Sequence, residues 1–133
     1  MATTRQLQLT VRYAETDAQG IVHHANYLVW FEEGRSDYLR QIDLNYTRFE
    51  KSGYFVVVAD ASVRYRAPAY YEDLVTIETT LEQAKGKTLK FSYRALRDTV
   101  LLAEGSTVHV VLGGPERRPT TLPDSLRKAL VDS

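Results

Sequence analysis

The residues best suited to chemistry lie between positions 13 and 26, where an aspartate and two histidines precede an apolar segment. Asp17 supplies the carboxylate, and His23 and His24 follow it. A carboxylate can attack a carbonyl carbon directly or act as a general base toward water. Unpaired backbone N–H groups at the start of a helix can then stabilise the oxyanion that forms. The segment therefore suits hydrolysis of an acyl compound without a metal ion.

Each of these residues also has a simpler structural interpretation. A loop aspartate such as Asp17 commonly accepts a hydrogen bond within an Asx turn, and His24 could cap or pack the helix instead of contacting substrate through its backbone. His23 is interpreted as structural or exposed. Tyr13 falls on the apolar side of an alternating segment, so packing competes with a hydrogen bond to substrate or to Asp17. Gly20 is most simply a backbone requirement of the loop.

A metal site is not predicted from Asp17, His23 and His24. Adjacent histidines usually point apart, and the segment provides no clear third ligand. The chain has no cysteine, which excludes disulfides, thiolate metal ligands and a cysteine nucleophile. Glu32 and Glu33, farther along the apolar segment, are reserve candidates for the catalytic carboxylate.

The elements that must position these residues can be read from hydrophobic periodicity. Residues 7–13 alternate between apolar and polar side chains, which predicts a half-buried strand. Residues 14–25 lose this alternation and contain a glycine, which predicts a loop.

A long helix is predicted from about residue 26 to residue 42. Asn26 is a good N-cap, with Ala25 or His24 as other starting residues. The first two turns are apolar nearly all round, which is typical of a buried helix. Gly34 inside the helix predicts the close approach of another backbone, because glycine there costs about 1 kcal/mol relative to alanine.

The second half of the chain predicts four antiparallel strands and a short terminal helix. The strands cover residues 54–67, 74–83, 88–97 and 100–112, and the helix covers 123–131. Gly105 is a possible bulge within the last strand. The order of one strand, a long helix and four strands predicts an α+β domain with the helix on one face of the sheet. The other face and the sheet edges remain open for self-association.

Length and charge exclude several classes of protein. The 133 residues suit a single domain, 1–133. Lysine plus arginine and aspartate plus glutamate both total 17, so there is no basic excess for nucleic acid. No signal peptide and no apolar stretch approaching the roughly 18 residues of a membrane span are visible. A cytoplasmic protein without a nucleic-acid partner is expected.

Two segments carry a resemblance to a known family. Residues 13–31 read YAETDAQGIVHHANYLVWF, and residues 63–75 read VRYRAPAYYEDLV. Both resemble hotdog-fold thioesterases of the 4-hydroxybenzoyl-CoA thioesterase and YbgC type, and the order of elements is similar from about residue 6 to residue 131. The resemblance implies an antiparallel sheet of about five strands wrapped around one long central helix. It also implies an acyl-CoA substrate, of which coenzyme A is a part, and no cofactor.

The same resemblance implies the assembly and the site. Protomers join sheets edge to edge as a homodimer, dimers pair into a homotetramer, and active sites lie between protomers. The family's catalytic carboxylate falls on Asp17, the histidine of the YbgC branch on His24, and a tyrosine on Tyr13. The residues expected to bind substrate are Gly20, Ala25, Asn26, Arg64 and Arg66, with the arginines available to the phosphates of coenzyme A.

Two other functions stay open at this point. A hotdog dehydratase acting on 3-hydroxyacyl thioesters could recruit His24 together with a carboxylate. An acyl-CoA-binding module without turnover is also compatible, because a pocket does not prove catalysis. The identity of the acyl group and the choice between nucleophile and general base for Asp17 are not readable from the residues.

Overall fold

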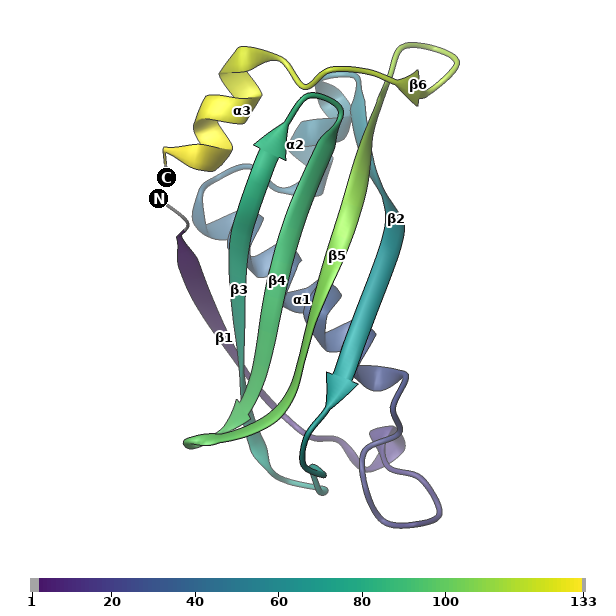
Figure 1. Ribbon diagram of the computed structural model, residues 1–133, viewed down its shortest axis with the longest axis vertical. Coiled ribbons are helices and arrows are strands. Elements are labelled where there is room, and N and C mark those ends of the chain that lie inside the picture. The colour runs from purple at the N-terminus through teal and green to yellow at the C-terminus, as the bar shows by residue number, and fades with distance from the viewer. Residues whose placement is uncertain (1–2, 133) are drawn as a thin grey trace.

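The computed structural model describes residues 3–132 and consists of one curved antiparallel sheet wrapped around a long helix (Figure 1). The strand order is β1-β3-β4-β5-β2, and β6 pairs with β5. The strands are β1 (Thr4–Thr10), β2 (Tyr54–Tyr65), β3 (Leu74–Lys85), β4 (Thr88–Arg97), β5 (Val100–Gly113) and β6 (Arg118–Pro119). The helices are α1 (Asn26–Gln41), α2 (Tyr46–Lys51) and α3 (Asp124–Val131), with a 3-10 turn at Tyr13–Glu15.

The predicted α+β hotdog architecture is confirmed. Helix α1 crosses behind the sheet, and the loop that precedes it lies beside the end of β2 (Figure 1). The four strands of the second half form close to their predicted positions. The first strand ends at Thr10, earlier than predicted, and the chain then turns into the 3-10 segment that contains Tyr13. Strand β6 was not predicted.

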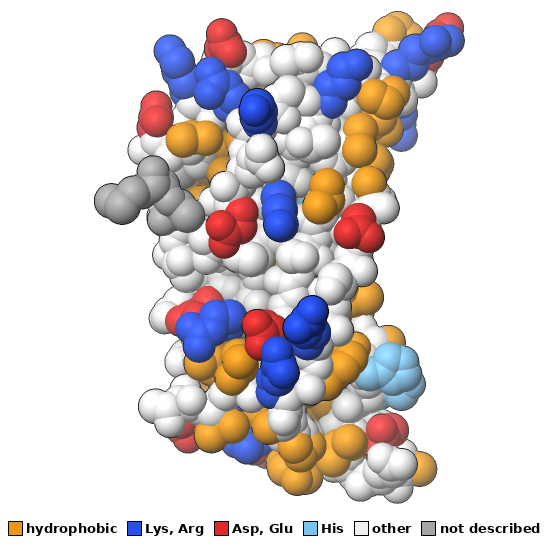
Figure 2. Space-filling view, in the orientation of Figure 1, with side chains coloured by type: hydrophobic (Ala, Val, Ile, Leu, Met, Phe, Trp, Pro, Cys, Tyr) orange, Lys and Arg blue, Asp and Glu red, His pale blue; other side chains and the backbone are white. Residues whose placement is uncertain are grey.

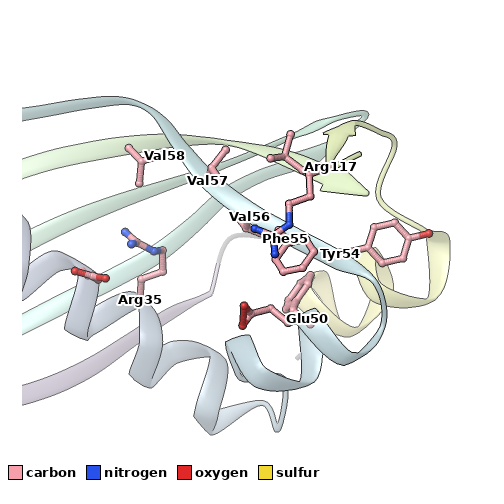
Figure 3. Close-up of a pocket in the computed structure, with 11 residues that line it drawn as sticks. Arg35, Glu50, Tyr54, Phe55, Val56, Val57, Val58 and Arg117 are labelled. Atoms are coloured by element: carbon pink, nitrogen blue, oxygen red, sulfur yellow. The ribbon is translucent and has the colours of Figure 1, made fainter. Parts of the chain in front are cut away.

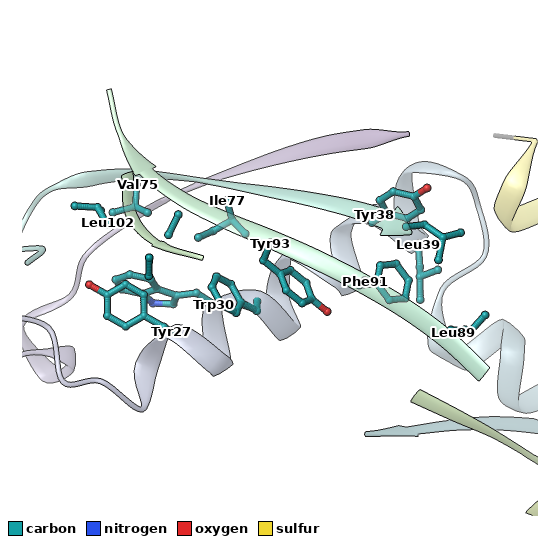
Figure 4. Packing of buried hydrophobic residues seen from close by; sticks show 14 of the residues in the cluster. Tyr27, Trp30, Tyr38, Leu39, Val75, Ile77, Leu89, Phe91, Tyr93 and Leu102 are labelled. Atoms are coloured by element: carbon teal, nitrogen blue, oxygen red, sulfur yellow. The ribbon is translucent and has the colours of Figure 1, made fainter. Parts of the chain in front are cut away.

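The core lies between α1 and the concave face of the sheet (Figure 4). Trp30 and Phe31 of α1 are buried, and Phe31 stacks on Tyr93 of β4 with ring centroids 4.6 Å apart. Tyr38 meets Phe91 edge-on at 5.7 Å. Each such side chain stabilises the fold by about 1.5–3 kcal/mol through removal of apolar surface from water. These contacts fix the helix, and with it the loop at its N-terminus, relative to β4 in the middle of the sheet.

Gly34 lets α1 approach the sheet, although the neighbour is not another backbone as predicted. A Cβ atom at Gly34 would lie 2.6 Å from Oγ1 of Thr79 and 2.8 Å from Cγ2 of Ile77. Both belong to β3 and both are buried. The glycine therefore makes room for two side chains of the central sheet.

The bulge predicted at Gly105 is absent, because Gly105 pairs in register with Val63 and Tyr93. A Cβ atom there would collide with the carbonyl oxygen of Ser62, so close packing explains this glycine. The register shift in β5 falls instead at Leu102, since Ala95 pairs with Ala103 and Leu96 with Leu101, and β2 has its own shift between Val58 and Asp60. It changes which residues of β2 face the helix.

One side of α1 remains open to solvent, contrary to the prediction of a helix buried all round. Leu28 and Val29 are 41% and 54% exposed, whereas Tyr27 and Trp30 are buried. The open side faces the groove beside β2, where Val58 is also 53% exposed. Within residues 3–132, no helix is long and apolar enough to cross a membrane.

Candidate active site

The loop that carries Asp17 is a closed turn rather than a free segment. The Asp17 N–H donates to the carbonyl oxygen of Ile21 at 2.8 Å, and the Gly20 N–H donates to the Asp17 carbonyl at 2.9 Å. Oδ1 of Asp17 accepts the Gln19 N–H at 2.8 Å, so the expected Asx-type bond is present. Gly20 has φ +82°, a left-handed conformation that favours glycine. The turn fixes one carboxylate oxygen, and within residues 3–132 the other accepts no hydrogen bond.

Glu15 anchors this loop to the central helix. Its buried carboxylate accepts the Arg12 N–H at 2.8 Å and the indole N–H of Trp30 at 2.7 Å. Its carbonyl oxygen accepts the His23 N–H and the side-chain amide of Asn26, both at 2.8 Å. Sequence reasoning missed Glu15, because a glutamate in a polar loop gives no local sign of burial. It is the residue that ties the position of the loop to the start of α1.

The start of α1 is formed by backbone geometry rather than by an asparagine cap. Ala25 occupies the N-cap position, and its N–H donates to Nδ1 of His23 at 3.2 Å. Asn26 is the first helical residue, and its side chain is bonded to the preceding loop, so its predicted role as N-cap is wrong. The carbonyl oxygen of His24 accepts the Tyr65 hydroxyl at 2.9 Å. The backbone N–H of His24 donates to no group in the described part of the chain.

Asp17 and His24 lie in the wall of one cleft, with a volume of about 490 Å³, between the loop, the start of α1 and the end of β2. Arg66 lines the same cleft, and its Nε bonds to Oε2 of Glu104 at 2.9 Å. Asp17 and His24, both from the loop before α1, thus line one cleft with Arg66, which directly follows β2.

Two aromatic residues form the inner wall of the Asp17 cleft. Tyr27 of α1 meets Tyr65 of β2 edge-on, with ring centroids 5.3 Å apart. Burial, followed by the nearby Tyr65, raises the pKa of the Tyr27 phenol. Tyr27 is therefore a neutral wall of the cleft at physiological pH, and it is not available as a base.

The other residues expected to belong to the site are placed differently. Tyr13 is 76% exposed, so its predicted packing on the strand is wrong, and its ring meets Tyr71 edge-on at 5.4 Å. Gly20 and Ala25 lie in the loop and at the helix start, next to the lining residues of the cleft. Arg64 lies apart from the cleft, in a separate hollow on the outer face of the sheet.

A second hollow, of about 370 Å³, lies toward the other end of β2 (Figure 3). Val56 and Val58 of β2 line it, with Arg35 of α1 on the opposite side. At its rim, the guanidinium of Arg117 lies 3.9 Å from the ring centroid of Phe55. This hollow is mainly apolar, and its charged lining residues are of both signs, with Glu32 and Glu50 beside the two arginines.

The two reserve carboxylates lie outside the Asp17 cleft. Glu32 lines the groove between α1 and β2 that contains the second hollow. Glu33 forms an ion pair with Arg40 at 2.9 Å on the exposed side of α1. Neither shares the cleft with the unpaired N–H of His24.

A buried chain of polar groups connects α1 to the middle of the sheet. Arg35 donates to the hydroxyl of Tyr93 at 3.0 Å, Tyr93 lies 2.6 Å from Oγ1 of Thr107, and that oxygen lies 2.7 Å from Nε2 of His109. Burial, followed by the positive charge of Arg35, lowers the pKa of His109 to about 4. His109 is therefore neutral at physiological pH, and sequence reasoning did not identify this chain.

Residues 3–132 contain no group of three or more histidine, cysteine, aspartate or glutamate side chains placed to hold a metal ion. The side chains that line the cleft include the Asp17 carboxylate, the His24 imidazole, two tyrosines and the Arg66 guanidinium.

Comparison with known proteins agrees with this fold. The profile of the thioesterase-like superfamily matches residues 11–130, and the chain belongs to this family. The acyl-CoA thioesterase YbgC of Haemophilus influenzae is 32% identical over 90% of this chain and 88% of its own. The crystal structure of the hypothetical protein TT1821 from Thermus thermophilus superimposes with a TM-score of 0.89 at 39% identity, covering 94% of this chain and 95% of that one. A 1,4-dihydroxy-2-naphthoyl-CoA thioesterase from Synechocystis superimposes with a TM-score of 0.88 at 25% identity, covering 98% and 99%.

Proposed function

We propose that the protein is an acyl-CoA thioesterase and that Asp17 is its catalytic carboxylate. The observation that carries the proposal is the convergence of Asp17 and His24 in one cleft at the N-terminus of a buried helix. The family and the names of relatives such as YbgC support the class of reaction. The Asp17 cleft holds the thioester carbon between the free oxygen of Asp17 and the backbone N–H of His24.

In the general-base route, Asp17 takes a proton from water while the water oxygen attacks the thioester carbon. The carbonyl oxygen becomes an oxyanion, which the His24 N–H and the positive end of the helix dipole stabilise. One such donor is worth about 3 kcal/mol in the transition state. The C–S bond then breaks, coenzyme A leaves as a thiolate and takes a proton, and the carboxylic acid is released.

In the nucleophilic route, an oxygen of Asp17 attacks the same carbon and expels the thiolate of coenzyme A. The product is a mixed anhydride, which water hydrolyses in a second step. Both routes use the same carboxylate and the same oxyanion contacts. Label in Asp17 after a single turnover in ¹⁸O-labelled water establishes the nucleophilic route, because only attack of water on the Asp17 carbonyl carbon of the anhydride can place it there.

The surrounding residues bind and orient the substrate. The bond from Tyr65 to the His24 carbonyl holds the peptide that follows the proposed oxyanion donor, the His24 N–H, and so ties the helix start to the end of β2. Gly20, Ala25 and Asn26 shape the loop and helix start against which the thioester lies. Arg66 is the cation in the cleft and the stronger candidate for a phosphate of coenzyme A. Arg64 lies outside the cleft and can bind a phosphate of coenzyme A only there. Tyr13 contacts the substrate through its exposed ring.

A homodimer formed by β2 completes the site. The outer edge of β2 pairs with no other strand of residues 3–132. Antiparallel pairing of two β2 strands about their midpoints sets Tyr65 of one copy opposite Tyr54 of the other. Tyr65 borders the Asp17 cleft and Tyr54 borders the second hollow. The cleft of one protomer therefore continues into the second hollow of its partner, which supplies apolar room for an acyl group and covers Leu28 and Val29.

The test is a thiol-release assay across acyl-CoA chain lengths and aromatic acyl-CoAs. The proposal predicts stoichiometric release of free coenzyme A and carboxylic acid from at least one member of the panel. Formation of an enoyl product without thiol release would establish the dehydratase alternative. Saturable binding of acyl-CoA with no turnover across the panel would establish the binding module.

A further inference from the structure

A groove runs between α1 and β2, from the second hollow into an adjoining hollow of about 260 Å³. Val58 of β2 and Arg35 of α1 line both hollows, so the two spaces meet at these side chains. Figure 2 shows hydrophobic side chains gathered along the upper part of the edge that β2 forms, and the exposed Val57 and Val58 belong to this strand. The groove therefore has an apolar wall of the kind that binds an acyl chain.

Arg35 places a buried positive charge in this groove. Its side chain rises from α1 toward Val58 in Figure 3, although the residue is only 6% exposed. Arginine stays protonated in proteins, and its guanidinium presents its donors in a planar fork. Glu32 and Glu50 line the groove as well, but both are exposed, so water screens their charges far more than the charge of Arg35. The charge that a ligand meets inside the groove is therefore positive.

A chain of neutral groups in the sheet orients the guanidinium of Arg35. Its Nη1 donates to the hydroxyl of Tyr93 at 3.0 Å, and Thr107 and His109 continue the chain of hydrogen bonds. Burial raises the pKa of the Tyr93 phenol, and burial together with Arg35 lowers the pKa of His109 to about 4, so both are neutral. Thr107 also lines the adjoining hollow beside Arg35. These three groups hold Arg35 in place and leave its positive charge intact.

We propose that Arg35 selects acyl-CoA substrates whose acyl group ends in a carboxylate, the monothioesters of medium-chain dicarboxylic acids. This inference rests on the proposed thioesterase function and assigns Arg35 to the far end of the acyl group. A carboxylate that enters an apolar groove loses its hydration and needs a partner there. A guanidinium can supply two parallel N–H···O bonds to it. An acyl chain that ends in a methyl group accepts no such bonds and lies against a cation instead.

The path from the Asp17 cleft to Arg35 determines the length of this acyl group. Tyr65 borders the cleft, and Ala61, which lines the adjoining hollow, lies four residues earlier on β2. At about 3.3 Å per residue, this step along the strand is about 13 Å. The proposed pairing of two β2 strands places the partner's Val58 opposite Ala61, so Arg35 and its copy in the partner both lie near this level. An extended acyl chain of medium length spans that distance, whereas a short one stops before it.

The test compares acyl-CoAs that differ only at the far end of the acyl group. Adipoyl-, suberoyl- and sebacoyl-CoA carry a terminal carboxylate, and hexanoyl-, octanoyl- and decanoyl-CoA end in a methyl group at the same chain lengths. Thiol release gives kcat/KM for each substrate. The wild type is expected to favour the carboxylate in the longer pairs and to show the smallest preference in the shortest pair. A preference for the methyl end at every length, or equal rates for carboxylate and ω-hydroxy ends, would overturn the proposal.

Substitutions of Arg35 show whether its charge causes the preference. In Arg35→Met the preference for the carboxylate is expected to fall by at least ~10-fold, the low end for hydrogen bonds to a charged group. Continued turnover of the methyl-ended substrates shows that this variant is folded, and Arg35→Lys, which keeps the charge, is expected to retain part of the preference. Arg40→Met removes an exposed arginine of the same helix, which pairs with Glu33, and is expected to keep the wild-type preference. An unchanged preference in Arg35→Met would overturn the proposal, and if that variant does not fold, the wild-type comparison decides.

Binding measurements separate this proposal from the proposed function. Non-hydrolysable S-alkyl and S-(ω-carboxyalkyl) thioethers of coenzyme A, matched in length, are titrated into the protein by calorimetry. The wild type is expected to bind the carboxylate-ended thioether at least ~10-fold more tightly, whether or not a thioester is turned over. Thiol release without a difference in rate or affinity between the two ends would keep the thioesterase and overturn the role of Arg35. The affinity difference without thiol release from any acyl-CoA would support Arg35 and overturn the proposed function.

Discussion

The buried imidazole of His109 makes stability depend on pH in a defined window. The folded pKa is about 4 and the ordinary value is 6.5, so the unfolded chain takes up a proton that the folded protein excludes. Because the unfolded state binds more protons between these values, the free energy of unfolding rises with pH across the window. The contribution is fully present above pH 6.5 and is lost as pH falls toward 4.

The size of this effect follows from the two pKa values. Each pH unit between them changes the free energy of unfolding by up to about 1.4 kcal/mol. His109 therefore accounts for a loss of about 2 kcal/mol between pH 7 and pH 5, and about 3 kcal/mol by pH 4. That is a large share of the 5–15 kcal/mol typical of a domain. Carboxylates titrate in the same range, so the effect of His109 must be isolated by difference.

The assay is urea unfolding of the wild type and His109→Gln at intervals from pH 7 to pH 4. Glutamine retains a polar group for Thr107 but has no titration in this range. The wild type should lose about 2 kcal/mol more than His109→Gln between pH 7 and pH 5. Parallel curves for the wild type and His109→Gln would refute the account of a buried neutral histidine.

Three further substitutions test the packing around the site. Gly34→Ala should lower the free energy of unfolding by about 1–2 kcal/mol, because the cost of overpacking against Thr79 exceeds the stability gained from the higher helix propensity of alanine. The urea midpoints of the two proteins measure this difference. Thr79→Val should raise the free energy of unfolding by about 1 kcal/mol, since Oγ1 is buried with no hydrogen-bond partner within residues 3–132; an unchanged or lower midpoint would contradict this. Glu15→Ala should lower the free energy of unfolding by about 3 kcal/mol and reduce kcat of the folded enzyme, because the Trp30 and Arg12 N–H groups lose their hydrogen-bond acceptor. A wild-type urea midpoint together with wild-type turnover would argue against Glu15 as the anchor of the loop.

Hydrophobic periodicity predicted most of the fold because the determining contacts repeat regularly along the chain. The helix from Asn26 and the strand pairs around Tyr93 follow from such patterns. The bulge after Val58 was not predicted, since both faces of that strand are apolar there and alternation cannot reveal a shift. The exposure of Leu28 was missed for a related reason, because an apolar residue on the surface looks like a core residue in the sequence.

The site was predicted in part, because resemblance identified the loop but not its supports. Asp17 was chosen from its segment, and Asp17 and His24 do share a cleft. Glu15 bonds to Trp30, 15 residues away, and His109 bonds to Thr107, which in turn bonds to Tyr93 of the neighbouring strand. A single sequence does not contain those distances, so buried polar groups of this kind become visible only in three dimensions.

The most direct test of the central claim is kcat of Asp17→Asn on an acyl-CoA that the wild type hydrolyses. Asparagine keeps an oxygen that can accept the Gln19 N–H, so the loop should remain closed and the thermal midpoint unchanged. The account predicts a loss of at least ~100-fold, the low end for removal of a general base. Asp124→Asn, at a carboxylate that is 84% exposed on α3, should keep wild-type turnover. Near-wild-type turnover in Asp17→Asn would contradict the assignment of Asp17 as the catalytic carboxylate.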